Sequence, residues 1–204
     1  MQACRLAALD LACRRGDRVL VCGLSFKLGA GEALHLAGPN GVGKSSLIRI
    51  LAGLLRPFAG SVEREGALVL ADERPALDAH LPLGAALEFW RRFDRADAAT
   101  LDVAIATLGL GDLLDVPVRY LSTGQRKRAA LARTLLAGAP LWLLDEPLNG
   151  LDTATTAAVE TLVAAHIGQG GIAVIASHQP FALAGMGRLE LAQYEPAPFE
   201  PAAA

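Results

Sequence analysis

The sequence has little lysine, few aromatic residues and no marked excess of charge of either sign. Of its 204 residues, 52% are hydrophobic and 20% are charged, a balance typical of one globular domain rather than of a disordered chain. The formal net charge of −2 gives no electrostatic reason to expect a nucleic-acid partner. Only three of the 19 basic residues are lysines (Lys27, Lys44 and Lys127), so a lysine inside a motif is informative.

Cysteine is also scarce. Cys4, Cys13 and Cys22 are the only three, and each lies nine residues from the next. That spacing matches neither a zinc site nor the Cys-x-x-Cys-His sequence of covalent haem attachment. An odd number of cysteines in a chain without a recognisable signal peptide is typical of free thiols in a reducing compartment.

No long apolar run is present. Asp10 interrupts residues 1–16, which therefore lack the apolar core of a secretory signal. The longest stretch without formal charge, 161–187, contains glycine, glutamine, histidine and proline at a density that a lipid-buried helix does not tolerate. We therefore expect a soluble protein that meets a membrane only through a partner.

The first third of the chain is expected to combine short strands with one helix. Segment 3–36 alternates apolar runs with glycine-containing turns, as small antiparallel strands do, and 32–37 enters a glycine-rich loop. A helix follows from Lys44 until Pro57 stops it, and 66–71 is a second buried strand. The expected buried face of the helix consists of Leu47, Ile48, Leu51, Leu54 and Leu55.

The rest of the chain changes from a helical to an alternating pattern. Residues 75–134 are expected to be mainly helical, with Asp97 as an N-cap. Strands and helices then alternate, which favours a mainly parallel sheet covered by helices on both faces. The tail, 195–204, is rich in proline and alanine and is predicted to be a disordered end. The predicted helices are 83–93, 98–108, 125–136 and 153–166, and the predicted strands are 141–144 and 172–176.

A phosphate-binding motif lies between the strand at 32–37 and the helix from Lys44. Its residues are Gly38, Pro39, Asn40, Gly41, Val42, Gly43, Lys44, Ser45 and Ser46, of which the first eight fit the pattern G-x-x-x-x-G-K-[ST]. The glycines let backbone N–H groups turn inward around phosphates, and the helix adds its positive dipole end. Lys44 would place a charge between the β- and γ-phosphates, and Ser45 a hydroxyl on Mg²⁺. The flanking strand and helix argue against an ordinary glycine turn with an incidental lysine.

Two acids follow the strand at 141–144. Asp145 stands where a strand ending beside the phosphate loop can hold Mg²⁺, directly or through water. Glu146, one residue further on, can act as the general base that polarises the attacking water. An isolated acid pair would be an ordinary turn after a buried strand, but this pair accompanies other nucleotide motifs.

Residues 121–125 indicate which kind of nucleotide-hydrolysing protein this is. Leu121-Ser122-Thr123-Gly124-Gln125 resembles the LSGGQ signature of ABC (ATP-binding cassette) ATPases, with Thr123 in place of the first glycine. The resemblance implies that Ser122, Thr123, Gly124 and Gln125 grip the γ-phosphate of ATP held by a second subunit, so that function requires a homodimer. Without its neighbours, Ser122 would be a plain helix cap.

Two further segments agree with this family. Asn149-Gly150-Leu151-Asp152 falls where ABC ATPases have their D-loop, which places Asp152 at the dimer interface by resemblance. Ser177-His178 follows an apolar strand as the family's switch histidine does, which implies that His178 contacts the γ-phosphate and orders Glu146. The implied fold is α/β, a P-loop NTPase (RecA-like) with a mainly parallel sheet. An N-terminal antiparallel β subdomain and a helical subdomain at about 75–134 would be added to it in a single domain, 1–204.

The family pattern is broken at two positions. The aromatic residue that stacks on adenine is missing from 13–17, where Arg15 could stack through its guanidinium plane. The glutamine expected near Mg²⁺ is also missing, because no glutamine occurs between Gln2 and Gln125. Glu73 is a candidate metal ligand at this place, and Arg74 is the other candidate for the equivalent position.

The shortness of the chain and several local runs, among them 140–147 and 177–180, resemble the ATP-binding subunits of cytochrome c biogenesis, which are haem-exporter ATPases. This implies a peripheral subunit, with ATP and Mg²⁺ as cofactors, paired with an integral membrane permease on the cytoplasmic face of the bacterial inner membrane. Three alternatives stay open: the ATPase of another ABC transporter, a soluble ABC ATPase of DNA repair or translation, and a nucleotide-binding subunit with impaired hydrolysis.

Overall fold

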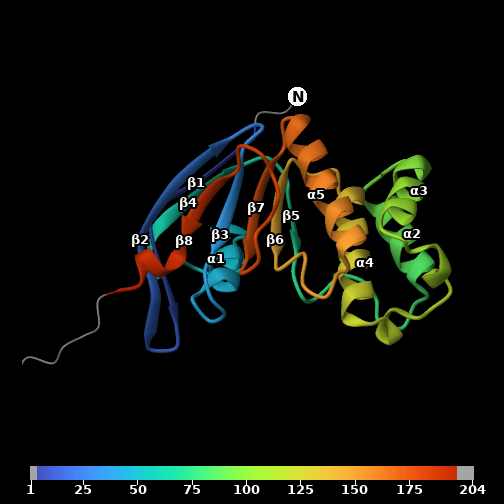
Figure 1. Ribbon diagram of the computed structural model, residues 1–204, viewed down its shortest axis with the longest axis horizontal. Coiled ribbons are helices and arrows are strands. Elements are labelled where there is room, and N and C mark those ends of the chain that lie inside the picture. Colours follow the sequence, from blue (N-terminus) through green and yellow to red (C-terminus); the bar gives the residue numbers. More distant parts are fainter. Residues whose placement is uncertain (1–3, 197–204) are drawn as a thin grey trace, which may run out of the picture.

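The computed structural model describes residues 4–196 and contains two sheets. Five parallel strands run in the order β5-β6-β7-β3-β8, and a separate antiparallel sheet has the order β2-β1-β4 (Figure 1). The predicted α/β class with a mainly parallel sheet is therefore confirmed. The strands are β1 (Arg5–Arg15), β2 (Arg18–Gly29), β3 (Ala33–Ala37), β4 (Ala59–Glu65), β5 (Leu68–Ala71), β6 (Leu141–Asp145), β7 (Ile172–Ser177) and β8 (Gly187–Glu190).

The central strands β3, β6 and β7 are buried along their whole length, as expected for a parallel sheet that is covered on both faces. Alternate side chains of each strand enter different cores. On β6, Leu141 and Leu143 join the core beneath α1 (Lys44–Leu51) and the antiparallel sheet, whereas Trp142 and Leu144 join the core beneath the other helices. The strand period of two thus divides the apolar residues between the two faces.

The helices on the second face are α2 (Leu83–Phe93), α3 (Ala98–Thr107), α4 (Thr123–Leu136) and α5 (Thr153–Gly168). In Figure 1, α4 and α5 lie against the parallel sheet, and α2 and α3 lie outermost. Asp97 caps α3 as predicted, because its carboxylate accepts a hydrogen bond of 2.6 Å from the Thr100 N–H. No helix within residues 4–196 has the length and apolar character needed to span a membrane. Most of the tail predicted to be disordered, from residue 197 on, lies outside the described residues.

The predicted extent of the first helix is wrong. It ends at Leu51, and Leu54 and Leu55 are 66% and 45% exposed instead of buried. The reason lies at Gly53, which has a φ of 79° and ends the helix in the left-handed conformation that glycine adopts most easily. The Arg64 guanidinium occupies the space beside Gly53 and donates a hydrogen bond to the Leu51 carbonyl.

Candidate active site

The phosphate-binding motif connects β3 to α1. Within the loop, Gly43 has a φ of 115°, and a Cβ atom there would lie 3.2 Å from the Leu20 side chain, so the position favours glycine. Lys44, the first residue of α1, is only 5% exposed. Its ammonium group donates hydrogen bonds of 2.8 Å to the Gly38 carbonyl and 3.1 Å to the Pro39 carbonyl. The lysine is therefore directed back over its own loop.

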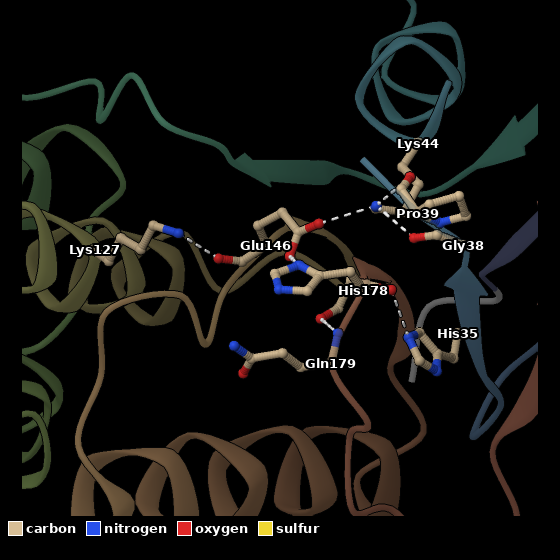
Figure 2. A network of polar contacts seen from close by, with 9 residues as sticks. His35, Gly38, Pro39, Lys44, Lys127, Glu146, His178 and Gln179 are labelled. Atoms are coloured by element: carbon tan, nitrogen blue, oxygen red, sulfur yellow. Dashed lines mark hydrogen bonds and ion pairs between the residues drawn. The ribbon is translucent and has the colours of Figure 1, made fainter. Parts of the chain in front are cut away.

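Neighbouring parallel strands bring the acid pair and the histidine to the same edge as this loop. Asp145 of β6 is in register with Ala176 of β7, and Ser177 of β7 is in register with Ala37 of β3. The residues that follow the three strands consequently emerge side by side. Figure 2 shows the result: Lys44 and His178 both contact the carboxylate of Glu146.

Glu146 lies at the centre of these contacts. Its Oε1 is 3.2 Å from the Lys44 ammonium, and its Oε2 is 3.0 Å from Nδ1 of His178. The Glu146 side chain is 12% exposed, whereas His178 is 36% exposed. The base, the lysine and the histidine that the sequence predicted thus form one contiguous group.

Asp145 is the most buried acid of the site, with 6% of its surface exposed. Burial raises the pKa of its carboxyl group, an effect that a hydrogen bond with Ser45 partly offsets. Its Oδ1 atom is buried and has no hydrogen-bond partner. A buried carboxylate oxygen left free beside a serine hydroxyl fits a divalent cation.

A cleft adjoins Lys44, Ser45 and Glu146. It is lined by Arg15, Leu20, Asn40, Gly41, Gly43, Lys44, Ser45, Ser46, Glu73, Glu146 and Asn149. Glu73 and Arg74 are the two candidates for the position of the missing glutamine. Glu73 lines the cleft, whereas Arg74 does not line it and donates its N–H to the Asp72 carboxylate. Within residues 4–196, no three His, Cys, Asp or Glu side chains are close enough to hold a metal by themselves. This agrees with the usual Mg²⁺ site, which combines one or two carboxylates with substrate phosphates.

A larger cavity lies elsewhere, at the opposite ends of the strands. It is bordered by Trp142, His166 and Gly171, near the starts of β6 and β7, and it contains none of the predicted site residues. The Trp142 and His166 rings stack with centroids 3.9 Å apart. The concentration of charged and phosphate-binding groups, rather than cavity size, therefore identifies the site.

The signature residues are not part of this cleft. Ser122 caps α4 in a reciprocal capping box: its hydroxyl accepts from the Gln125 N–H at 3.2 Å, and its own N–H donates to the Gln125 side chain at 2.8 Å. Ser122 and Thr123 are exposed. Gly124 packs on the D-loop, since a Cβ atom there would lie 2.5 Å from the Gly150 carbonyl oxygen. Thus the chain does not bring its own signature to its own phosphate loop.

Asp152 is also exposed and caps α5, because its carboxylate accepts a 2.8 Å hydrogen bond from the Thr155 N–H. That bond, together with the Thr155 hydroxyl, lowers the pKa of Asp152.

Sequence reasoning missed one residue of the site, Lys127, and one backbone contact of the D-loop residue Asn149. Lys127, on α4, donates a hydrogen bond to the backbone carbonyl of Glu146, and the Asn149 N–H contacts the same oxygen at 3.3 Å. The only sequence signal for Lys127 is the rarity of lysine, since its partner is a backbone atom that any residue would supply.

Comparison with known proteins identifies the class of protein. A family model described as "ABC transporter" matches residues 21–149. The chain therefore belongs to the ABC transporter family, and its phosphate loop, acid pair and cleft make it an ATP-binding subunit of that family with ATPase activity. A solved ABC transporter ATP-binding protein from Pyrococcus furiosus shares the fold, with a TM-score of 0.80 and 21% identity over 94% of this chain and 100% of that one.

The relatives narrow the class further. The chain is 62% identical to the "Cytochrome c biogenesis ATP-binding export protein CcmA" of Novosphingobium aromaticivorans, over 96% of this chain and 100% of that protein. It is 54% identical to the protein of the same name from Sphingopyxis alaskensis, over 88% of this chain and 92% of that protein. The chain is a CcmA-like ABC ATPase.

Proposed function

We propose that this ATPase drives haem export for the biogenesis of c-type cytochromes. It would act as a homodimer on the cytoplasmic face of a bacterial inner membrane, bound to an integral membrane permease of the CcmB kind. The observation that carries the proposal is the 62% identity to a cytochrome c biogenesis export protein across the whole of that relative, combined with a complete Lys44–Glu146–His178 group.

The chemistry follows from the groups in the cleft. Lys44 exchanges its contact with Glu146 for the β- and γ-phosphates of ATP, which bind an ammonium group more strongly than one carboxylate does. Glu146 then accepts a proton from water as the water oxygen attacks the γ-phosphorus. The bond from that phosphorus to the bridging oxygen breaks, and ADP leaves with the electron pair. His178 keeps Glu146 oriented through its Nδ1 contact.

We assign the metal to Ser45, Asp145 and Glu73. The unpartnered buried Oδ1 of Asp145 and the position of Glu73 on the cleft support this assignment. Mg²⁺ bound there would neutralise charge on the phosphates. Arg15, at the same cleft, is the candidate for stacking on the base.

The exposed signature supports a homodimer. Ser122 and Gly124, at the start of α4, do not line the chain's own nucleotide cleft, so a second subunit would be needed for them to reach a γ-phosphate. The D-loop containing Asp152 packs on Gly124 and would share that interface.

The test is complementation. In a bacterium that lacks its own ATP-binding subunit for cytochrome c biogenesis, the wild-type chain and its neighbouring permease should restore covalent haem in periplasmic cytochromes, measured by haem-stained gels. Lys44→Ala, which removes the phosphate-binding charge, is the inactive control. Wild-type protein that hydrolyses ATP and binds a permease but restores no cytochrome would point to another transporter. Full ATPase activity without any membrane partner would favour a soluble ABC ATPase.

A further inference from the structure

The backbone of Glu146 has an unusual conformation. Its φ of 50° lies in the left-handed region, which residues other than glycine, asparagine and aspartate rarely adopt. Within residues 4–196, only Asp10 and Arg95 share this property among non-glycine residues. Such a conformation persists only where surrounding contacts enforce it.

Both backbone polar groups of Glu146 are engaged. Its N–H donates to the Ala176 carbonyl of β7 at 2.7 Å, which ties the residue to the parallel sheet. Its carbonyl accepts a hydrogen bond from the Lys127 ammonium (Figure 2). At a longer distance, 3.3 Å, the same carbonyl accepts from the Asn149 N–H. The charged donor makes the Lys127 bond the stronger of the two.

Lys127 connects this carbonyl to the signature helix. It lies on α4, the helix that Ser122 caps. Farther along α4, Ala129, Leu131 and Ala132 are buried in the core, which anchors the helix to the rest of the domain. The Lys127 ammonium is half-buried and close to the charges of Glu146, Glu73 and Asp145. The group that holds the Glu146 backbone therefore lies on the same helix as the signature residues.

We propose that Lys127 is a positioning residue for ATP hydrolysis. It fixes the Glu146 main chain in the left-handed conformation that directs the carboxylate into the nucleotide cleft. Through α4, it also connects this base to the signature motif of the same subunit, the motif that would contact the partner's nucleotide. The inference rests on the proposed role of Glu146 as the base.

The first test compares two identical substitutions in the full chain. Lys127→Met retains the length and packing of the side chain but loses the donor, and Lys27→Met makes the same change at an exposed position of β2. For Lys127→Met, we expect kcat to fall by about tenfold or more, as for other small misplacements of a catalytic group, with KM and nucleotide affinity little changed. Lys127→Arg, which retains a charged donor, should recover much of the rate, and Lys27→Met should match wild type.

The second test separates positioning from a general structural role. In a Glu146→Gln background the base is already missing, so adding Lys127→Met should lower the residual single-turnover rate little further. Wild-type kcat for Lys127→Met, or an equal loss with and without the Glu146 carboxylate, would overturn the proposal while leaving Glu146 as the base. A Glu146→Gln chain that hydrolyses ATP at the wild-type rate would instead overturn the base assignment and this proposal together. Thermal unfolding of each variant identifies any loss that comes from misfolding.

Discussion

At the scale of single residues, the carboxylate of Glu146 is shared by two groups with different tasks. Lys44 contacts Oε1 from the phosphate loop, and His178 contacts Oε2 from the end of β7. The Lys44 contact competes with phosphate binding, because one ammonium group serves both. His178 contacts Glu146 through Nδ1 alone, so it can hold the proposed base while the lysine moves to the nucleotide.

The Glu146→Gln substitution replaces the carboxylate by an amide, which should leave nucleotide binding intact and remove the proposed base. We expect ATP hydrolysis to fall by about 10²-fold or more, the usual contribution of general base catalysis. Because nucleotide is bound but not consumed, the variant should accumulate as an ATP-bound dimer, measured by size-exclusion chromatography. Turnover at the wild-type rate would transfer the role of base to His178 or Glu73.

The burial of Asp145 leads to a prediction about how the stability of the protein depends on pH. Burial raises the pKa of its carboxyl group in the folded state, so the charged form opposes folding, and the associated stability is lost as pH rises through that raised pKa. Asp145→Asn removes this cost, and we expect its melting temperature without nucleotide or metal to exceed that of wild type at neutral pH. The difference should shrink as pH falls through the raised pKa toward the ordinary pKa of a carboxyl group, because folded wild-type Asp145 then takes up a proton.

Calorimetric melting curves across that pH range provide the measurement. A difference that stays constant with pH would mean that Asp145 is not the titrating group. Asp152→Asn is a useful comparison, because the pKa of Asp152 is lowered by its cap hydrogen bonds and the sign is reversed. The charged form of Asp152 favours folding, so its replacement should destabilise the protein at neutral pH and less so in acid.

At the scale of elements, α4 has two roles that substitutions can separate. Its capping box stabilises the helix start, and its first residues are the proposed contact to the partner's nucleotide. A substitution at Gly124 would confuse the two, because any side chain there collides with the Gly150 carbonyl of the same chain. Ser122 is the cleaner position, since it is exposed and its hydroxyl has one hydrogen bond within the chain.

Ser122→Ala should lower stability by about 1 kcal/mol, the usual cost of losing an N-cap side chain. Asp97→Ala at the start of α3 is the matched control, because it removes another exposed cap that has no proposed role in catalysis. Chemical denaturation should show similar losses for both, whereas only Ser122→Ala should lower ATP turnover. Equal turnover in the two variants would leave Ser122 as a helix cap alone.

The elements that the sequence predicted well have a strong local signal. The buried strands β3, β6 and β7 are continuous apolar runs, and α2 and α3 begin and end within a residue of the predicted limits. Two strands were missed. In β4 only Val62 is even partly buried, and β8 is a four-residue edge strand, so neither has an apolar pattern that sequence reasoning can detect.

In the site, too, the features with a local sequence signal could be predicted and those that depend on packing could not. The phosphate loop, the acid pair and His178 could be predicted because each has a short motif at the end of a strand. The Lys127 contact and the left-handed backbone of Glu146 could not be predicted, because they depend on how α4 packs beside β6. A backbone carbonyl as a partner leaves no pattern in the side chains.

At the scale of the whole molecule, the phosphate loop and the signature lie on different layers. The loop begins α1 on one face of the parallel sheet, and α4 packs on the other face. In the proposed homodimer, each subunit would present half of two sites, so we expect the rate per subunit to depend on protein concentration. We expect wild-type specific ATPase activity to fall on dilution below the dimerisation constant and to recover on concentration. A rate per subunit that is independent of dilution would indicate a monomeric ATPase.

The left-handed backbone of Glu146 also bears on how such a chain can diverge. A glutamate at this position is kept against the local conformational preference of the residue, whereas glycine or asparagine would adopt the same φ more easily. Selection for stability alone therefore favours loss of the proposed base, and only selection for turnover opposes that loss. In a lineage that retained the fold as a nucleotide-dependent scaffold, position 146 would be among the first to drift. A glycine or asparagine at position 146 would indicate a duplicated copy that binds nucleotide but no longer hydrolyses it.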